Sequence, residues 1–500
     1  MRILLDTNIF IYPEDDKVIP QELQDLLQIL SKTRTEILVH PLSLQELGKD
    51  KNETRKRIIL SKVGSYPQLE SPPDLSKDED FKKRLTESND HDRIDNSVLF
   101  AVYKNAVHFL ITEDKGIHKR ASDIGIEERV LLIDDALQIF KRDIMKSKPI
   151  SPPALKEDFV YNLDVNDPIF GKLKQDYPEF EDIWFPKISR EGRKCWVHRK
   201  GDGKIGALLI YKIEDEPIEG TPPLPKKKRL KISTFIVTNV GQKIGELLIK
   251  ISIDFCVKNN LLEMYLTHFT EPDDRLVQLI SEYGFRKASA NLRNEEIYLK
   301  RMIPDASSVS AMTPLQIVNE YYPSFYDGGD ARKYIVPIQP KFHSQLFTDY
   351  TGRQTRLSEH IGEFIVEGNT IKKAYLTNSK ITRIQSGDII LFYRSRDRSE
   401  ITSLGVVESI HMRLTDPDEI MKVVGKRTVY SRDEIEEMAK KPTTVLLFYH
   451  ICHLSKPVSY QTLRDVGALT GPPQSIRGIS DNSYQEIIRR SGIDERFTVH

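Results

Sequence analysis

Short apolar runs separated by polar stretches mark the first part of the chain, and the first run predicts a core strand. Ile3-Leu4-Leu5 leads directly into Asp6. Ile37-Leu38-Val39 and Phe109-Leu110-Ile111 also have the length and residue types of buried strands. From Asp95 onward, apolar positions recur at helical spacing. We therefore expect strands and helices that form a parallel α/β sheet.

Four acidic residues lie at these predicted elements. Asp6 and Asp114 follow strands, Glu46 comes just after the second strand, and Asp95 lies in the helix. Open α/β sheets bind their ligands beyond the carboxyl ends of the strands. We expect the four carboxylates to come together at that edge of the sheet.

Asp95 gives the clearest chemical clue, because it shares a helix face with Val98, Leu99 and Val102. A buried carboxylate costs several kcal/mol unless it is paired. Arg93 and the lysine after the helix point to other faces. A divalent cation shared with the other acids would satisfy Asp95, and oxygen ligands favour Mg²⁺ or Mn²⁺ over zinc.

This segment resembles the PIN-domain nucleases in the order and setting of its acids. The resemblance implies a metal-dependent endoribonuclease that hydrolyses phosphodiester bonds in RNA, tRNA included, and a homodimer formed through this domain. The implied metal-binding and catalytic residues are Asp6, Glu46, Asp95 and Asp114, supported by Thr7, Asn8 and Thr112. Asp92 is a further candidate acid. The alternative is that the aspartates cap turns and helices while Glu46 is a solvated helix residue.

The middle of the chain predicts strands at residues 195–198, 205–211 and 230–237. The last strand leads into a glycine-bearing turn, residues 238–245, and then into a helix. One side of that helix is apolar and carries Ile244, Leu247, Leu248, Ile251 and Phe255. Such a turn favours anion binding, because free backbone N–H groups and the helix dipole point at it.

Residues 230–300 resemble the GNAT acetyltransferases, which bind acetyl-CoA on such a turn. The resemblance implies cofactor contacts from Ile236, Val237, Gly241, Gln242, Lys243, Ile244, Gly245 and Glu246. The turn departs from the family pattern at Val240 and Lys243, and Ile280 stands where many members have a tyrosine. Glu263 and His268 are candidate bases. The alternative is a scaffold of the same shape whose glycines serve the turn alone.

The carboxyl-terminal part predicts strands at residues 373–376, 388–393, 403–407 and 444–449, which suggest a small barrel. Residues 385–393 resemble the PUA-like barrels of the ASCH and EVE type, which implies RNA binding. The candidate contacts are Tyr393, Arg394, Arg396, Arg398 and Arg477. The alternative places Phe392 in the core and the arginines in a solvated loop. We expect His450 and His453 to be strand residues rather than ligands.

Composition limits these interpretations. The 74 basic and 74 acidic side chains balance, which argues against polyanion binding by the whole surface but leaves room for local basic patches. Three scattered cysteines favour neither a disulfide scaffold nor a cysteine metal site, so we expect a cytoplasmic protein. No apolar run has transmembrane length, and no membrane partner is expected. The basic string at residues 225–229 is expected in a solvated loop, with a nuclear-localisation signal as the alternative.

Two breaks in composition, at residues 147–154 and 303–311, predict three domains. The fold class is multidomain α/β and α+β. We expect a PIN-like parallel α/β/α sandwich over 1–146, a GNAT-like mixed α/β sheet over 147–303 and a PUA-like β-barrel over 304–500.

The preferred hypothesis is a toxin-like ribonuclease with an acetyl-CoA-binding module and an RNA-recognising barrel. The first rival is an N-acetyltransferase acting on a protein or an RNA-linked amine, with the other domains serving recognition. The second rival is a non-catalytic regulator.

Overall fold

The computed structural model describes residues 1–10, 21–31, 35–48, 56, 59–60, 63, 66–144, 154–200, 202–238, 243–350, 363–365 and 370–500. The chain divides into two compact units. Unit 1 comprises Met1–Ile150, Asp273–Arg275 and Arg413–Pro442, and unit 2 comprises the remaining residues. The boundaries expected for three domains stay a prediction.

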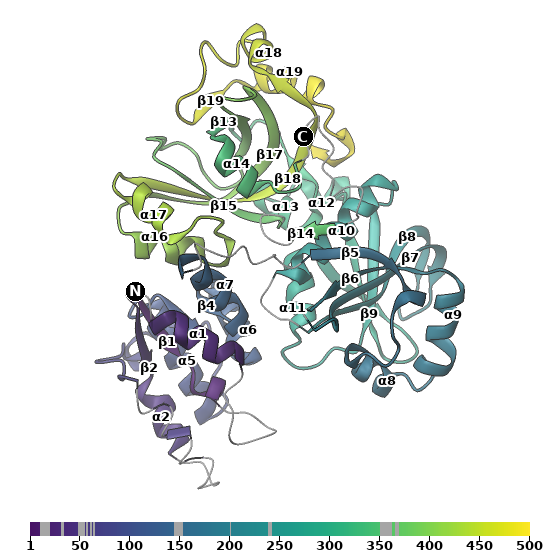
Figure 1. Cartoon of the computed structure of the whole chain (residues 1–500). Helices are drawn as coiled ribbons and strands as arrows, with labels where there is room; N and C mark the ends of the chain where they lie inside the picture. Colours follow the sequence, from purple (N-terminus) through teal and green to yellow (C-terminus); the bar gives the residue numbers. More distant parts are fainter. Residues whose placement is uncertain are drawn as a thin grey trace. The chain divides into compact units, whose positions relative to one another are not determined.

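Unit 1 contains a four-stranded sheet in which all strands run parallel (Figure 1). Its order is β2 (Glu36–Val39), β1 (Arg2–Leu5), β3 (Phe109–Ile111) and β4 (Val130–Leu131). The apolar runs of the sequence thus form the first three strands. The accompanying helices are α1 (Gln21–Ser31), α2 (Pro41–Leu47), α4 (Glu79–Lys82), α5 (Asp90–Tyr103), α6 (Lys115–Asp123) and α7 (Ile133–Ile144).

Helices cover both faces of this sheet. Two neighbouring residues of β3 show this, because successive side chains of a strand point to opposite faces. Leu110 packs in one core with Val98 and Leu99 of α5. Phe109, the preceding residue of β3, packs its ring against Phe140 of α7, with ring centroids 6.4 Å apart. The expected three-layer α/β/α arrangement is therefore present.

A segment from late in the sequence also belongs to unit 1. Residues Arg413–Pro442 carry helices α16 (Pro417–Val424) and α17 (Arg432–Ala439). Arg427 forms an ion pair with Glu128 at 2.9 Å, and the amino group of Met1 lies 3.1 Å from Asp418.

Unit 2 contains a mixed eight-stranded sheet (Figure 1). Its order is β10 (Phe285–Ala290), β11 (Glu296–Arg301), β9 (Glu263–His268), β8 (Leu224–Val237), β7 (Ile205–Ile218), β6 (Lys194–Arg199), β5 (Ala154–Phe159) and β14 (Glu363–Ile365). Strands β8 and β9 run parallel, and the other neighbours run antiparallel. Its helices are α8 (Gly171–Asp176), α9 (Phe185–Arg190), α10 (Ile244–Lys258) and α11 (Arg275–Glu282).

The basic string at residues 225–229 lies within β8, so the expected solvated loop is wrong. Strand β7 presents an acidic row opposite it: Glu214 pairs with Arg229, Asp215 with Lys228 and Glu216 with Lys227. Opposite charges on neighbouring strands stabilise the pairing. These acidic residues lie on a different strand. The sequence of residues 225–229 alone therefore resembles that of a loop, which is why the strand was not predicted.

A second sheet of unit 2 has six strands, in the order β15 (Lys372–Thr377), β18 (Thr443–Ser459), β17 (Glu400–Leu414), β16 (Ile389–Arg394), β13 (Lys333–Ile338) and β19 (Arg477–Ile479). Strands β12 (Phe325–Tyr326) and β20 (Thr498–Val499) form a separate parallel pair. The nearby helices are α12 (Ala306–Val309), α13 (Pro314–Tyr321), α14 (Pro340–Leu346), α18 (Tyr460–Asp465) and α19 (Asp481–Ser491).

The expected barrel is wrong, because this six-stranded sheet is open. Within the described residues it ends at β15 on one side and at the short strand β19 on the other. No ladder of hydrogen bonds joins these two edges, so the sheet does not close on itself. The predicted strands themselves are present as β15, β16, β17 and β18.

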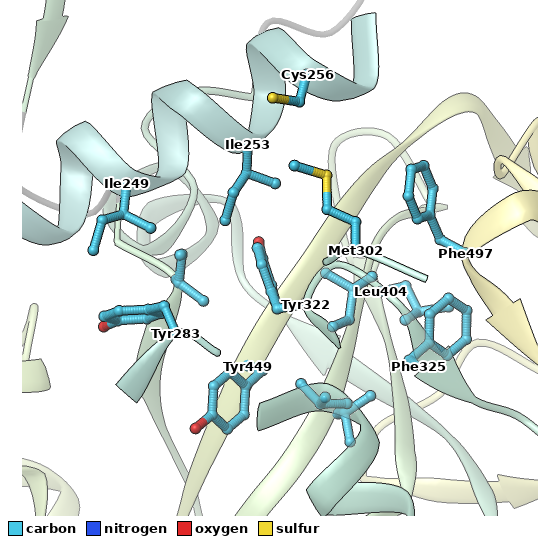
Figure 2. Packing of buried hydrophobic residues seen from close by; sticks show 14 of the residues in the cluster. Ile249, Ile253, Cys256, Tyr283, Met302, Tyr322, Phe325, Leu404, Tyr449 and Phe497 are labelled. Carbon is cyan, nitrogen blue, oxygen red and sulfur yellow. The ribbon is translucent and has the colours of Figure 1, made fainter. Parts of the chain in front are cut away.

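Helix α10 packs in a core that includes residues of both sheets of unit 2. Figure 2 shows Ile249, Ile253 and Cys256 of this helix in the cluster with Met302 and Tyr322. Leu230 of β8 and Leu404 of β17 belong to the same cluster. Every residue from Ile244 to Ile253 is buried, so the helix lacks the solvated side that its sequence suggests.

None of the described helices is both long and apolar enough to cross a membrane.

Gly284 offers a test of the packing between α11 and α13. It adopts φ +80°, and a Cβ atom there would lie 2.0 Å from the backbone oxygen of Glu320. Gly192 also has a positive φ, +62°, but a Cβ atom there would have no neighbour within 4 Å. We expect Gly284→Ala to lower the free energy of unfolding by about 3 kcal/mol or more, measured by urea denaturation. Gly192→Ala should cost about 1 kcal/mol, and equal losses would contradict the packing shown.

Candidate functional site

The four acids predicted for unit 1 come from elements that the local sequence specifies. Asp6 follows β1, and Glu46 lies in α2, which begins at Pro41. Helix α5 carries Asp95 and is capped by Asn89, whose side chain accepts a hydrogen bond from the backbone N–H of Asp92 at 2.8 Å. Asp114 caps α6 and accepts a hydrogen bond from the backbone N–H of Ile117 at 3.0 Å.

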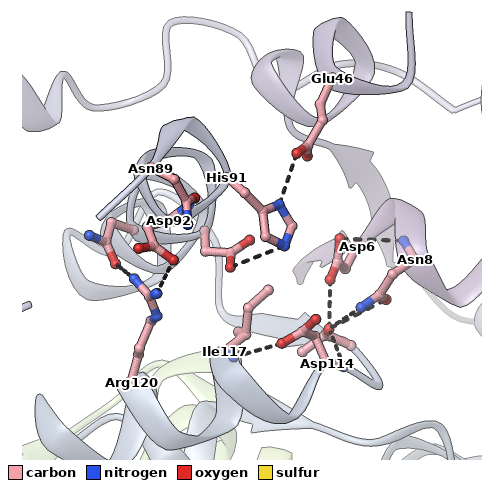
Figure 3. A network of polar contacts seen from close by, with 12 residues as sticks. Asp6, Asn8, Glu46, Asn89, His91, Asp92, Asp114, Ile117 and Arg120 are labelled. Atoms are coloured by element: carbon pink, nitrogen blue, oxygen red, sulfur yellow. Dashed lines mark hydrogen bonds and ion pairs between the residues drawn. The ribbon is translucent and has the colours of Figure 1, made fainter. Parts of the chain in front are cut away.

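Thr112 links two of these acids, Asp6 and Asp114, which are labelled in Figure 3. Its hydroxyl donates to Asp6 Oδ2 at 2.6 Å and accepts from the backbone N–H of Asp114 at 3.0 Å. The side-chain amide of Asn8 also donates to the Thr112 hydroxyl, at 3.2 Å. Of the residues expected to support the acids, Thr112 therefore contacts both Asp6 and Asp114, and the Asn8 amide contacts Thr112.

His91 lies among the acids and was not predicted there. Its Nδ1 atom is 2.8 Å from Glu46 Oε1, and its Nε2 atom is 3.8 Å from Asp95 Oδ2 (Figure 3). His91 precedes Asp95 by one helical turn, a spacing that was visible in the sequence. The imidazole ring thus connects Glu46 with Asp95.

Burial dominates the electrostatics of this acid cluster, by which we mean Asp6, Glu46, Asp95 and Asp114. It raises the pKa of Asp6 to about 6, although the Thr112 hydrogen bond opposes the shift. It raises the pKa of Asp95 to about 7, opposed by His91 and reinforced by the charges of Asp114 and Asp6. Burial alone would lower the pKa of His91, but the charges of Asp95 and Glu46 outweigh this and raise it.

Asp92 stands apart from the acid cluster, so its candidacy as a further acid is not supported. Its carboxylate forms an ion pair with Arg120, which also donates to the Asn96 side chain at 2.8 Å. A hydrogen bond from the backbone of Ser88 and the charge of Arg120 lower the pKa of Asp92. Arg120 lies on α6, too far along the sequence for local spacing to reveal the pair.

Among the described residues, no group of three or more histidine, cysteine, aspartate and glutamate side chains is arranged to hold a metal ion. His91, rather than a shared ligand position, connects Glu46 with Asp95. Asp6 and Asp95 therefore bind protons more readily than ordinary aspartates, but the acid cluster does not form a ready ligand set for Mg²⁺ or Mn²⁺.

A second candidate site lies in unit 2, where β8 and β9 separate. Their parallel pairing covers Leu230 to Ile232 on β8, which pair with Met264 to Leu266 on β9. Beyond Ile232, β8 continues along β7 as far as the pair of Val237 with Ala207. The backbone of β8 from residue 233 to 237, which includes Ile236 and Val237, therefore has an edge without a strand partner among the described residues.

Helix α10 begins just beyond this edge. Lys243 at its N-cap adopts φ 52°, and its side chain makes no capping hydrogen bond. The backbone N–H groups of Ile244, Gly245 and Glu246 lie in the first turn, where a helix leaves them without internal partners. The predicted contacts Gly241 and Gln242 lie outside the described residues, as does Val240.

Two of the predicted residues also have packing roles. A Cβ atom on Gly245 would lie 2.6 Å from a methyl group of Leu279, so any larger residue there would displace the Leu279 side chain of α11. The buried carboxylate of Glu246 accepts hydrogen bonds from the backbone N–H groups of Ile371 and Lys372 at 2.8 and 3.0 Å. The carboxylate therefore holds residues 371 and 372 and is not free to contact a cofactor. Only the backbone N–H of Glu246, in the first turn of α10, stays a candidate contact.

Glu263 is wrong as a candidate base. Burial would raise its pKa, but hydrogen bonds from Lys227 and Arg229, at 2.6 and 2.7 Å, outweigh burial and lower it. A carboxylate held by two cations is a poor proton acceptor. His268 ends β9 and is half-buried. Ile280 is fully buried in the core.

The predicted nucleic-acid contacts do not form one exposed surface. Tyr393 is 1% exposed and lies in the core, so its ring is not available for stacking on a base. Arg394 forms a bidentate pair with Asp397, with its Nε atom 2.9 Å and its Nη2 atom 2.6 Å from Oδ2. Arg398 lies 3.8 Å from Glu400. Arg396 and Arg477 are exposed.

No family model and no curated protein matches the chain. Among solved structures, ASCH from Zymomonas mobilis matches with a TM-score of 0.24 and 13% identity, covering 32% of this chain and 94% of that one. The PaiA N-acetyltransferase from Thermoplasma acidophilum in complex with coenzyme A matches with a TM-score of 0.20 and 13% identity, covering 26% and 76%. The NatC complex bound to Gag peptide and CoA matches with a TM-score of 0.19 and 16% identity, covering 29% and 95%. These likenesses assign the chain to no family, and the functions proposed below rest on the geometry of the sites.

The raised pKa of Asp95 predicts how stability depends on pH. A carboxyl whose pKa is higher in the folded than in the unfolded protein stabilises the fold at low pH, and this contribution is lost as pH rises through the folded value. The loss for Asp95 falls between about pH 4 and pH 7. We therefore expect the free energy of unfolding of Asp95→Asn, minus that of the wild type, to be about 2 kcal/mol larger at pH 8 than at pH 4. Urea denaturation at the two pH values measures this difference.

Asp92→Asn is the matched control on the same helix. Because the pKa of Asp92 is lowered, its carboxylate stabilises the fold at neutral pH and loses that effect as pH falls. This variant should be less stable than the wild type at pH 8, and the difference should shrink at low pH. The same trend in both variants would contradict the electrostatics described.

Proposed function

We propose that unit 2 binds an acyl-coenzyme A, with acetyl-CoA as the expected form, and transfers its acyl group to an amine. The observation that carries this proposal is the unpaired edge of β8 beside the start of α10. An extended ligand can pair with the strand edge, and a pyrophosphate fits the N–H groups of the first helical turn. The acceptor class expected from the sequence is a protein amine or an amine carried by RNA.

The two parts of this site would have separate tasks. The edge of β8 from residue 233 to 237 would hold the arm that ends in the thioester. The N–H groups of Ile244, Gly245 and Glu246 would hold the phosphates. Attack by a neutral amine on the thioester carbon forms the amide, breaks the carbon–sulfur bond and releases the thiol.

Reversing the charge of Lys243 tests the turn as the phosphate site. We expect Lys243→Glu to weaken acetyl-CoA binding at least tenfold, about 1.4 kcal/mol, because a carboxylate would replace an ammonium beside the phosphates. Isothermal titration calorimetry measures the affinity, and thiol release in the presence of amine acceptors measures transfer.

Lys258→Glu makes the same charge change at the opposite end of α10, where Lys258 is exposed. It should leave acetyl-CoA affinity unchanged. Failure of the wild type to bind acetyl-CoA, or equal weakening by both substitutions, would rule out a cofactor site at this turn.

Phosphodiester hydrolysis by unit 1 is the second candidate function, with RNA as substrate and the PIN-type nucleases as the family model. It is supported by the convergence of Asp6, Asp95 and Asp114 and by the raised pKa values of Asp6 and Asp95. Burial destabilises the charged form of a carboxylate, and a nearby cation stabilises that form again. The acids would hold Mg²⁺ or Mn²⁺ once His91 leaves Glu46 and Asp95.

We expect this second function to depend on Asp6. Purified protein incubated with tRNA should cut it in the presence of Mn²⁺ but not after addition of a chelator. Asp6→Asn should lower the rate by at least a hundredfold, about 2.7 kcal/mol, whereas Asp92→Asn, which changes an acid paired with Arg120, should keep most of it. Cleavage that resists the chelator or survives Asp6→Asn would exclude the acid cluster as its source.

A further inference from the structure

A β-bulge brings two hydroxyl groups together in the six-stranded sheet of unit 2. Phe392 of β16 pairs with Ser403 of β17, whereas Tyr393 pairs with Ile401, so Thr402 is an extra residue. Neighbouring side chains of a regular strand point to opposite faces, and a bulge redirects them. Here the Thr402 and Ser403 hydroxyl oxygens lie 3.2 Å apart, and both residues are fully buried.

Ser403 begins a chain of polar contacts that draws on distant parts of the sequence. Its Oγ atom is 2.8 Å from His453 Nδ1, and His453 Nε2 is 3.0 Å from Asp349 Oδ1. The other carboxylate oxygen of Asp349 forms an ion pair with Lys250 of α10. A serine, a histidine and a carboxylate are thus connected in the order found in serine hydrolases.

The contacts determine where the protons lie. Burial would raise the pKa of Asp349, but the charge of Lys250 and the hydrogen bond from His453 outweigh burial and hold it well below its usual value. An ionised carboxylate only accepts hydrogen bonds, so His453 Nε2 must donate to it. In neutral His453 the Nδ1 atom then carries the lone pair and accepts the hydrogen bond from Ser403. This is the tautomer that a general base requires.

His450 provides a second indication of a ligand. Its ring centroid lies 4.4 Å from that of His453, and its side chain is 2% exposed. Neither of its ring nitrogens has a hydrogen-bond partner among the described residues. Leaving a buried polar group unpaired costs free energy. A ligand beside His453 could satisfy His450 and remove that cost.

We propose that Ser403, His453 and Asp349 form a hydrolytic centre for small carboxylic esters or amides. This centre uses none of the residues proposed to contact acyl-CoA and none of the acid cluster. Ser403 Oγ attacks the acyl carbon while its proton passes to His453 Nδ1. The bond to the leaving alcohol or amine breaks, and that group takes the proton from His453. A water molecule then attacks the acyl carbon, gives a proton to His453 and releases the acid, and the proton returns to Ser403.

The burial of the three residues is graded. Ser403 is fully buried, whereas the side chains of His453 and Asp349 are 21% and 18% exposed. The centre therefore contacts solvent at the histidine and carboxylate, and both the substrate and the attacking water would reach Ser403 from that side. This favours small acyl groups over bulky ones.

A small serine-directed reagent tests the proposal. We expect diisopropyl fluorophosphate to react with the full-length protein at Ser403: a bond forms between Ser403 Oγ and phosphorus, fluoride leaves, and the proton passes to His453. Mass spectrometry of the digested protein should place one adduct on Ser403. Ser403→Ala should abolish the adduct, and Asp349→Asn should slow its formation at least tenfold. p-Nitrophenyl acetate hydrolysis should fall in parallel.

Ser409→Ala is the matched control. Ser409 also lies on β17 with its hydroxyl 3.4 Å from a histidine, His411, and it should be dispensable for adduct formation. Circular dichroism checks that each variant folds. If one does not, the Ser403→Cys protein is treated with iodoacetamide instead, and we expect alkylation at position 403. An unmodified Ser403 in the wild type, an adduct that persists in Ser403→Ala, or an unreactive thiol in the folded Ser403→Cys protein would each overturn the proposal.

Discussion

Burial of residues 244–253 of helix α10 on all sides is the constraint on which the structure of unit 2 depends. A helix at a protein surface usually turns one apolar stripe to the core and a polar face to water. The run from Ile244 to Ile253 instead lies entirely out of solvent, in a core shared with both sheets. Each fully buried aliphatic side chain contributes about 1.5–3 kcal/mol, so this helix accounts for much of the association between the two sheets.

That burial forces the polar residues of the helix to find partners. Glu246 accepts two backbone hydrogen bonds from residues 371 and 372, and Lys250 pairs with Asp349. Removing one member of a buried ion pair typically costs about 3–5 kcal/mol, because the remaining charge has no water to solvate it. These contacts therefore fix where residues 349, 371 and 372 lie along α10. Apolar packing alone would allow them to shift along the helix more easily.

Features that depend on neighbours in sequence could be predicted, and features that depend on distant partners could not. Apolar runs located β1, β2 and β3, because a strand inside a parallel sheet is buried on both faces. Helical spacing correctly indicated the burial of Asp95. It could not show that Arg120 neutralises Asp92, or that β7 supplies acids opposite the basic string. His91 was the exception, since its position one turn before Asp95 was available from local spacing.

The two sites proposed for unit 2 share helix α10 and are therefore mechanically linked. The turn of the proposed acyl-CoA site ends at Lys243. Lys250 lies about 10 Å further along the axis and pairs with Asp349, which contacts His453. A packed helix moves as a rigid element, so a ligand that shifts its first turn also shifts Lys250. Glu246 lies between them and ties the same helix to the start of β15. A displacement of α10 at this turn would thus move Asp349 through its ion pair with Lys250, and it would move β15 through the hydrogen bond that Glu246 accepts from Lys372.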